Sequence, residues 1–329
     1  MALAACTGGG VGGQNGSDDE VTLKYAFFAP AASFPSLQME EWKKQIEERT
    51  DGKVKVELFP GGTLLGAGDI YDGVSSGVVD VGLDSPAYDT GRFPVSSVIN
   101  LPLGFTDATS ASAAFLALLD EEKPKEFEQF EIITAFTTEP AYLQTKKPVR
   151  TRSDLAGMNV RTSGAQLPVL EQLGAAPVAM PMPDVPQSMQ TGVIEGYVSS
   201  REVLKDFGLV DQVSYVTDYP LGMSNSFVAV MSKEKYDALP DDVKQIIQEL
   251  KPEMSKWASE YHDKENVGKA LDEAKGKGVE TVEVEASEKP AWDEVRDKQV
   301  EAWVSRNTSI DAEKTVEKMR DLQKKHGGG

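Results

Sequence analysis

Cysteine and histidine are scarce in this sequence of 329 residues. The one cysteine, Cys6, excludes an internal disulfide. The two histidines, His262 and His326, lie in polar segments near the C-terminal end. Zinc and iron sites are built mostly from clusters of these two residue types, and the sequence holds no such cluster. We therefore predict neither a metal nor a cofactor.

Positive charge and long apolar runs are also in short supply. Lys and Arg number 34 against 53 Asp and Glu, which gives a formal net charge of -19. Nucleic acids and anionic membranes need basic surface, so we predict neither as a partner. The sequence contains no run of about 18 apolar residues, the length that a helix needs to span a bilayer. With 40% hydrophobic and 26% charged residues, the composition is globular, and the length suits two lobes.

The residues around Cys6 indicate a role for it. The segment from Leu3 to Cys6 (Leu-Ala-Ala-Cys) matches the lipobox at which a bacterial lipoprotein signal peptide is cleaved and the cysteine acylated. The Gly-rich segment 7–17 follows, as expected of a flexible tether. We predict that residues 1–19 hold the chain outside the cytoplasm through a lipid on Cys6. An accidental Ala/Cys start to a cytosolic protein is the alternative.

Alternating hydrophobic patterns predict an α/β fold with two lobes. Residues 21–28 alternate as a strand, and the next apolar stripe, Met39, Trp42 and Ile46, has helical spacing. Repeated strand–helix–strand patterns imply parallel pairing with right-handed crossovers. We predict that each lobe is a βαβ-type sheet flanked by helices, and that long C-terminal helices bridge the two. The predicted boundaries are lobe 1 at 20–130 with a strand returning at about 225–232, lobe 2 at 131–224, and a helical region at 233–329.

Segment 147–164 is the most informative part of the sequence. Its pattern predicts a turn, a short helix and a strand that ends at Arg161, followed by Thr-Ser-Gly and another helix. Side chains at the carboxyl ends of strands in open α/β sheets face the ligand-binding crevice. A guanidinium fork suits a carboxylate bidentately. We predict that Arg161 captures a small anion, and a structural ion pair is the alternative.

Polar and aromatic residues follow several other predicted strands. Together with Arg161 they would surround a crevice between the lobes, which predicts a binding site for a small polar molecule. Serine hydroxyls there would donate hydrogen bonds and aromatic rings would form a wall, although Ser163 could equally cap a helix. The candidate binding residues are Arg161, Ser163, Ser199, Ser200, Ser85, Tyr88, Phe28 and Tyr142.

Three apparent motifs have simpler explanations. Gly8–Gly13 has dinucleotide-fingerprint spacing but lacks the flanking strand and helix. Gly73–Gly77 has the spacing of a nucleophile elbow around Ser75, but it falls inside a helical pattern. A serine hydrolase using Ser75 stays a remote alternative, and we predict that the protein is not an enzyme. Three acidic residues near one strand end could in principle hold calcium, but solvated loop carboxylates are the favoured explanation: Asp80, Asp84 and Asp89.

The sequence resembles the extracytoplasmic solute receptors of TRAP (tripartite ATP-independent periplasmic) transporters, the dicarboxylate-binding-type family. The matching segments follow the family's order over about residues 20–260. They are Phe59-Pro-Gly-Gly-Thr-Leu-Leu-Gly66 with Gly77-Val-Val-Asp80, the segment 148–161 ending in Arg161, Met189-Gln-Thr-Gly-Val-Ile-Glu-Gly196, and Ser232–Val243.

The resemblance implies two α/β lobes that close on a ligand by hinge motion. It also implies membrane transporter subunits as partners, no catalysis, and a carboxylate-clamping role for Arg161. Two departures stand out: Ser199 and Ser200 occupy the neighbourhood where many members carry asparagine, and Glu139-Pro140 stands where some carry a second arginine. An unpaired buried carboxylate is costly, so we predict a monocarboxylate or similar monoanion. A receptor for another uptake or sensing system is the alternative.

Overall fold

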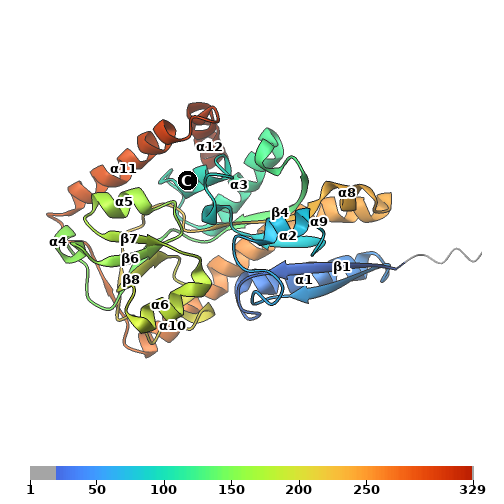
Figure 1. Ribbon diagram of the computed structural model, residues 1–329. Coiled ribbons are helices and arrows are strands. Elements are labelled where there is room, and N and C mark those ends of the chain that lie inside the picture. Colours follow the sequence, from blue (N-terminus) through green and yellow to red (C-terminus); the bar gives the residue numbers. More distant parts are fainter. Residues whose placement is uncertain (1–19, 328–329) are drawn as a thin grey trace, which may run out of the picture.

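The computed structural model describes residues 20–327 and contains two β-sheets flanked by helices (Figure 1). This architecture confirms the predicted two-lobed α/β fold. The first sheet has the order β2 (Val54–Phe59), β1 (Val21–Phe27), β3 (Val81–Asp84), β10 (Ser226–Ser232) and β4 (Phe130–Thr137). The second has the order β11 (Glu280–Val282), β9 (Tyr215–Thr217), β5 (Tyr142–Thr145), β8 (Gly196–Ser199), β6 (Asn159–Thr162) and β7 (Ala176–Ala179).

Both sheets combine parallel and antiparallel pairs. In the first sheet β1 pairs in parallel with β2 and β3, and β10 runs antiparallel to β3 and β4. In the second sheet β6 pairs in parallel with β7 and β8, with Arg161 opposite Tyr197. The carboxyl ends of parallel neighbours meet at one edge of a sheet, which is where open α/β folds bind ligands.

Helices cover the sheets because their apolar stripes pack inward. In α1 (Phe34–Arg49), Ser33 stands at the N-cap position, Pro35 lies in the first turn, and Met39, Trp42 and Ile46 are buried. The α-helices are α1 (Phe34–Arg49), α2 (Ile70–Ser75), α3 (Ala108–Glu122), α4 (Arg152–Leu155), α5 (Leu167–Gln172), α6 (Val185–Thr191), α7 (Val203–Asp206), α8 (Lys233–Asp237), α9 (Asp241–Tyr261), α10 (Val267–Gly276), α11 (Lys289–Arg306) and α12 (Ala312–His326).

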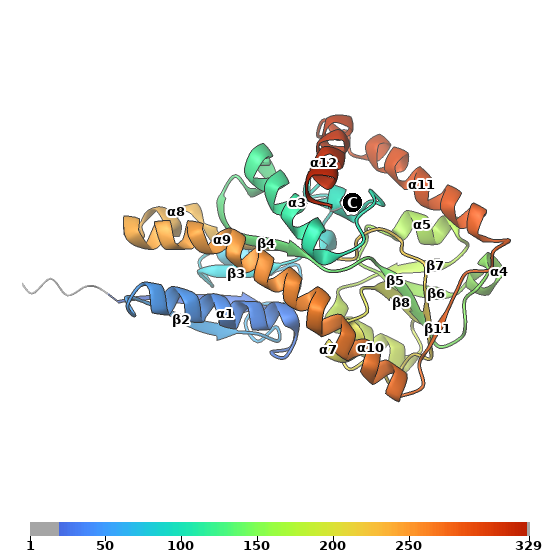
Figure 2. The ribbon, with the colours of Figure 1, turned by 180° about the vertical axis from the view of Figure 1, so that it is seen from behind.

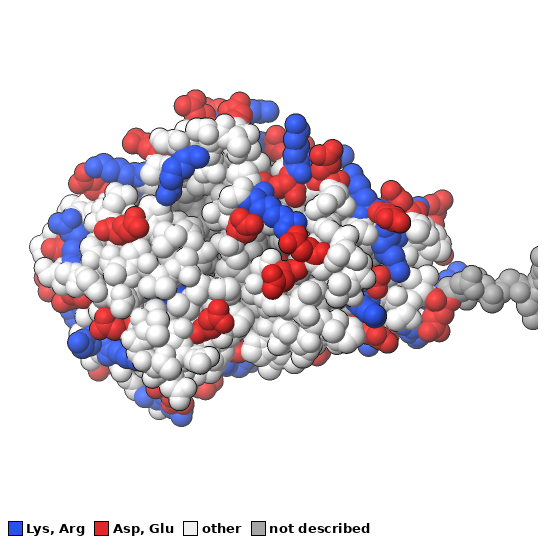
Figure 3. Space-filling view, in the orientation of Figure 1, with Lys and Arg blue, Asp and Glu red and all other residues white. Residues whose placement is uncertain are grey.

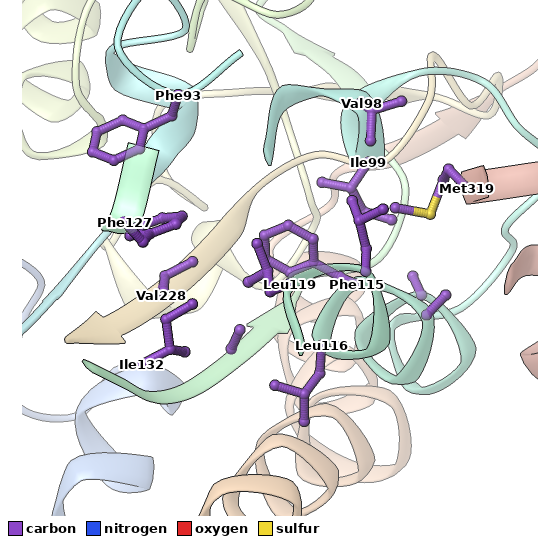
Figure 4. Close-up of a cluster of buried hydrophobic side chains, with 14 of the residues drawn as sticks. Phe93, Val98, Ile99, Phe115, Leu116, Leu119, Phe127, Ile132, Val228 and Met319 are labelled. Atoms are coloured by element: carbon purple, nitrogen blue, oxygen red, sulfur yellow. The ribbon is translucent and has the colours of Figure 1, made fainter. Parts of the chain in front are cut away.

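The two faces of the first sheet bury separate hydrophobic clusters. Ile132 and Val228 point to one face and pack against α3 and α12 through Phe115, Leu119 and Met319 (Figure 4). Their neighbours in β4 and β10, such as Ile133 and Phe227, join α1 and α9 on the other face. Strand residues alternate between faces, so these two strands are buried on both sides.

The position of β4 corrects the predicted lobe boundary. The sequence places Ile132–Phe136 in lobe 2, together with the next strand, because consecutive strands usually lie beside one another. Instead β4 pairs with β10 from Phe130 to Thr137 and belongs to the first sheet. The chain therefore crosses to the second sheet at residues 138–141, and it crosses back at residues 218–225 between β9 and β10.

The C-terminal segments contact both sheets. Figure 2 shows α9 passing along the first sheet and continuing through a π-helical turn, His262–Asn266, into α10. α9 packs against α1 and β4, whereas α10 packs against α7 in the second lobe. α11 contacts α5, and α12 contacts α3. The segment also contributes β11 to the second sheet, which sequence analysis did not anticipate. Within residues 20–327, no helix is both long and apolar enough to cross a membrane.

Candidate ligand-binding site

A narrow cavity lies where the two sheets face one another. Its walls come from both lobes and from the segments that cross between them. β1 and the start of α1 contribute one wall, the ends of β6 and β8 with α7 the opposite wall, and Thr138, Ser224 and Asn225 the crossing segments. Its lining combines aromatic rings with a few polar side chains, the composition typical of small-molecule sites.

Arg161 lies in β6 with only 2% of its surface exposed. The strand extends one residue beyond it, to Thr162, rather than ending at Arg161 as predicted. Its Nε donates to the Met180 carbonyl at 2.9 Å, and its Nη1 donates to the Val198 carbonyl at 3.4 Å. These two carbonyls fix the plane of the guanidinium and leave other N–H groups for a ligand.

No carboxylate neutralises Arg161 within the part of the chain that the structure describes. None of the ion pairs within 4.0 Å includes it, and the groups that favour its charged form are the Tyr88 hydroxyl, Tyr197 and the more distant Asp184. Burial lowers the pKa of Arg161, although a guanidinium stays protonated in proteins. A buried, uncompensated positive charge is costly unless an anion joins it, so the cavity suits an anion.

On the face shown in Figure 3, acidic and basic side chains are interspersed, in keeping with a formal net charge of -19. Among the cavity-lining residues that the structure describes, Arg161 is the one Lys or Arg side chain.

Aromatic rings form the apolar wall of the cavity. The Phe28 ring lies 4.4 Å from that of Phe27 and 5.5 Å from that of Tyr88, between ring centroids. Phe34 and Phe227 continue the same wall with centroids 6.3 Å apart. Such a wall buries a ring or a short aliphatic body, while a few polar groups orient it.

Six of the eight predicted binding residues line the cavity: Arg161, Ser163, Ser199, Ser200, Tyr88 and Phe28. Tyr88 also links the lobes, because its hydroxyl accepts a hydrogen bond from the Met182 N–H at 3.2 Å. The Ser163 hydroxyl donates to Gln166 at 3.4 Å, and the Ser200 N–H donates to Ser224 Oγ at 2.8 Å.

Ser85 and Tyr142 are not among the residues that line the cavity, so their binding roles stay predictions. Ser85 caps a short 3-10 helix, and its hydroxyl donates to Asn225 Oδ1 at 2.6 Å, so it stands behind Asn225. The Tyr142 ring lies beneath the Arg201 guanidinium, 4.2 Å from ring centroid to Cζ. Ser85 follows β3, where the turn directs its hydroxyl to Asn225, and Tyr142 begins β5, where Arg201 covers its ring.

Sequence analysis missed an acidic group at the cavity. Glu202 follows β8 and Asp206 ends α7; both are buried and line the cavity. Nearby, Arg201 is bound by Glu139, whose Oε1 accepts from the Arg201 Nε at 2.9 Å and from its backbone N–H at 2.8 Å. In the sequence, only the segment Ser-Ser-Arg-Glu at residues 199–202 could have indicated this acidic group. A solvated loop has the same kind of polar sequence, so the segment could not distinguish the two.

The structure gives ordinary roles to the residues of the rejected motifs. Ser75 donates to the Tyr71 carbonyl inside α2, and His262 accepts from the Glu139 N–H, so no hydrogen bond joins the two. Asp80 pairs with Lys235 at 3.0 Å. Burial raises the pKa of Asp84 to about 7. Residues 20–327 contain no group of three or more side chains of His, Cys, Asp or Glu that could hold a metal ion. Cys6 and Gly8–Gly13 lie outside the described residues.

Two sheets that face one another across a buried, arginine-bearing cavity define the class of two-lobed solute receptors. The chain belongs to the family of bacterial extracellular solute-binding proteins, family 7, whose model matches residues 26–307. It is a TRAP-type solute-binding receptor, and its family and structural neighbours are binding proteins rather than enzymes.

Individual relatives are similar to this protein over most of its length. A TRAP periplasmic solute-binding protein from Desulfovibrio salexigens, solved as an open complex, is 39% identical with a TM-score of 0.81, over 94% of this chain and 97% of that one. A marine metagenome TRAP protein specific for aromatic acids, solved with 3-hydroxybenzoate, is 26% identical with a TM-score of 0.88, over 94% and 99%. The ectoine/5-hydroxyectoine-binding periplasmic protein UehA of Ruegeria pomeroyi is 28% identical over 69% of this chain and 68% of its own length.

Proposed function

We propose that this receptor captures a small organic acid with a single carboxylate and delivers it to TRAP membrane subunits. The observation that carries the proposal is Arg161, buried at the cavity without a carboxylate partner among the described residues. Its fork would bind the ligand carboxylate, with Ser163, Ser199 and Ser200 as neighbouring hydroxyls. Two hydrogen bonds between opposite charges are strongest in such a buried setting.

The pairing of Arg201 with Glu139 supports a ligand with one carboxylate rather than two. A dicarboxylate needs a second cation, and the next arginine along the second sheet is already bound to Glu139. The second carboxylate would then be buried without a partner, which is costly. The aromatic wall around Phe28 and Tyr88 favours a ring or short apolar body instead. The relative solved with 3-hydroxybenzoate carries a ligand of this kind.

Substitution of Arg161 tests the proposal. A thermal-shift screen of small carboxylates, sulfonates, amino acids and sugars first identifies a ligand, since saturation at about 100 times Kd stabilises a fold by about 2.7 kcal/mol. Calorimetry then compares the chain with Arg161→Lys and Arg161→Met. We expect each variant to lose at least about 2–3 kcal/mol of binding free energy, because lysine keeps the charge but not the fork.

Arg150→Lys is the matched control, since Arg150 is exposed in the same segment and should bind the ligand unchanged. Equal affinity of the chain and Arg161→Lys for every carboxylate would reject the proposal. A dicarboxylate as the tightest ligand would reject its monocarboxylate part alone.

We also propose that the chain works outside the cytoplasm, tethered through an acylated Cys6. The Leu-Ala-Ala-Cys motif and the Gly-rich segment behind it support this, as does a family of periplasmic binding proteins. Expression with a lipoprotein signal, followed by intact-mass analysis of the membrane fraction, should find the acyl chains on Cys6. A soluble, unmodified product with a correctly cleaved signal would contradict the tether.

A further inference from the structure

Glu202 is a second buried charge-bearing group at the cavity whose partner is missing. It stands between β8 and α7 with 4% of its surface exposed. Its Oε1 accepts a hydrogen bond from the Ser200 hydroxyl at 2.7 Å, and its Oε2 has no hydrogen-bond partner among the described residues. Buried polar atoms are nearly always paired, so an unpaired oxygen beside a ligand cavity calls for an explanation.

The cations near Glu202 are bound to other acids. Arg201 is held by Glu139 at 2.9 Å, and Lys205 lies 3.2 Å from Asp206 Oδ1. The closest nitrogen of His262, Nε2, is 4.0 Å from Glu202 Oε2. That nitrogen uses its lone pair to accept the Glu139 N–H at 2.9 Å, so it has no proton to donate to Glu202.

Asp206 has partners that Glu202 lacks. The Oδ2 atom of Asp206 accepts from the Phe34 N–H at 3.1 Å and from Asn266 Nδ2 at 3.0 Å. Asp206 is therefore part of the contact that joins α1, α7 and the π-helical turn. Of the two acids at the cavity, Glu202 alone has a carboxyl oxygen without a hydrogen-bond partner among the described residues.

Arg161 and Glu202 do not satisfy one another. No ion pair within 4.0 Å joins them in the described part of the chain, although both line the same cavity. Arg161 belongs to the β6 wall with Tyr88 and Met182, whereas Glu202 lies where α7 meets the start of α1. The cavity thus offers one unpaired positive group and one unpaired acid at separate places, with aromatic rings along its wall.

We infer that the ligand is a compact zwitterion whose carboxylate binds Arg161 and whose protonated nitrogen binds Glu202. This inference rests on the proposed function, because it adopts the Arg161–carboxylate contact and adds the second contact. A simple monoanion would give Glu202 no countercharge, and a dianion would bring a second negative charge to Glu139, Glu202 and Asp206. A zwitterion with a ring between its charges would pair with Arg161 and with Glu202, and its ring would pack against the aromatic wall.

The electrostatics at Glu202 agree with this assignment. Burial is the main cause that raises the pKa of Glu202 well above its usual range, and the charges of Glu139 and Asp206 raise it further. Without a ligand cation, the carboxyl therefore favours its neutral form. A bound ammonium group would provide the missing countercharge and favour the carboxylate.

Matched ligands can distinguish the effect of the ligand's ammonium group on affinity from the effect of the ligand's shape. The probes form series with different spacings between carboxylate and nitrogen: 3-(aminomethyl)benzoate with 3-ethylbenzoate and 3-(hydroxymethyl)benzoate, the same three substituents at the 4-position, and phenylalanine with 3-phenylpropanoate. Members of a series differ in one terminal group. In at least one series we expect the ammonium compound to bind about tenfold or more tightly than its partners, since a charge-assisted hydrogen bond is roughly twice as strong as a neutral one.

Glu202→Gln tests the residue itself. The variant keeps the shape and removes the charge, so the preference for the ammonium compound should fall to within about threefold. Glu195→Gln is the matched control, because Glu195 precedes the same strand, β8, away from the cavity, and the preference should persist there. Circular dichroism and the melting temperature check that each variant is folded.

Two results would overturn the inference. One is equal or tighter binding of a compound without the ammonium group in every series, which needs only the unsubstituted chain. The other is a preference that survives in folded Glu202→Gln. In either case, if Arg161→Met still abolishes binding of the simple carboxylates, the zwitterion inference fails while the proposed function stands. If no carboxylate of any series binds, both fail together.

Discussion

Arg161 and Arg201 stand at the ends of neighbouring parallel strands in the same sheet, and their environments differ in one respect. Arg201 has Glu139, which crosses from the first sheet and accepts hydrogen bonds from its guanidinium and its backbone N–H. Arg161 has only backbone carbonyls and the Tyr88 hydroxyl. The same side chain is therefore part of the internal structure in one place and free for a ligand in the other. The presence of an internal partner decides which arginine can bind an anion.

Methionine substitutions at the two positions give the largest contrast. Arg161→Met should lose most carboxylate affinity, while the ligand-free protein should be no less stable, because an unpaired buried charge is removed. Arg201→Met should do the reverse. It leaves Glu139 buried without a cation, which we expect to cost about 2 kcal/mol of unfolding free energy, below the roughly 3–5 kcal/mol of a fully buried pair, because the Arg201 side chain is 23% exposed.

Urea unfolding without ligand and calorimetry with the screened ligand measure the two effects separately. Carboxylate affinity in Arg201→Met should change by no more than about threefold, because Arg201 does not line the cavity. Equal loss of affinity in both variants would show that Arg201 also faces the ligand, and the contrast between the arginines would then disappear.

Acid should weaken the Glu139–Arg201 region through His262. Burial is the main cause that lowers the pKa of His262 to about 3, and the charge of Arg201 contributes. Between pH 6.5, the ordinary value, and about 3, the unfolded chain binds a proton at this site that the folded chain does not. Stability therefore rises with pH through this window and is lost as pH falls.

His262→Gln isolates this smaller contribution. Glutamine can still accept the Glu139 N–H but does not titrate. The stability advantage of histidine over glutamine should therefore shrink as pH falls from 7 toward 3, by an amount on the order of 2 kcal/mol. Urea unfolding of both chains at several pH values measures the difference directly. A difference that stays constant across the range would mean that His262 does not titrate with a lowered pKa.

The architecture was largely predictable because local patterns carry it. Alternating residues in 21–28 and helical stripes such as Met39, Trp42 and Ile46 indicate strand and helix without any tertiary information. The position of Arg161 near a strand end, followed by Thr-Ser-Gly, indicated the side chain that faces the cavity. The partner of β4 was not predictable, because adjacency in the sequence favours a hairpin-like neighbour and the actual partner, β10, lies about ninety residues further on.

The acidic part of the site depends on contacts between distant segments. Glu139 and Arg201 are 62 positions apart, and Asp206 and Phe34 are 172 apart. Residue types and spacing do not encode such pairings, so the sequence could not show that Arg201 is neutralised or that Glu202 keeps an unpaired oxygen. For the same reason it could not show that Ser85 turns toward Asn225 and that Arg201 covers Tyr142.

The sequence by itself determined the two-lobed α/β class and the arginine that faces the cavity. Periodicity and strand ends are local properties, and a hydrophobic or charged side chain has the same preference wherever the segment lies. Only the tertiary structure decided which charges are paired and which are free. Pairing depends on which segments the fold brings within a few ångströms, and this sets both the cost of burying each charge and its availability to a ligand.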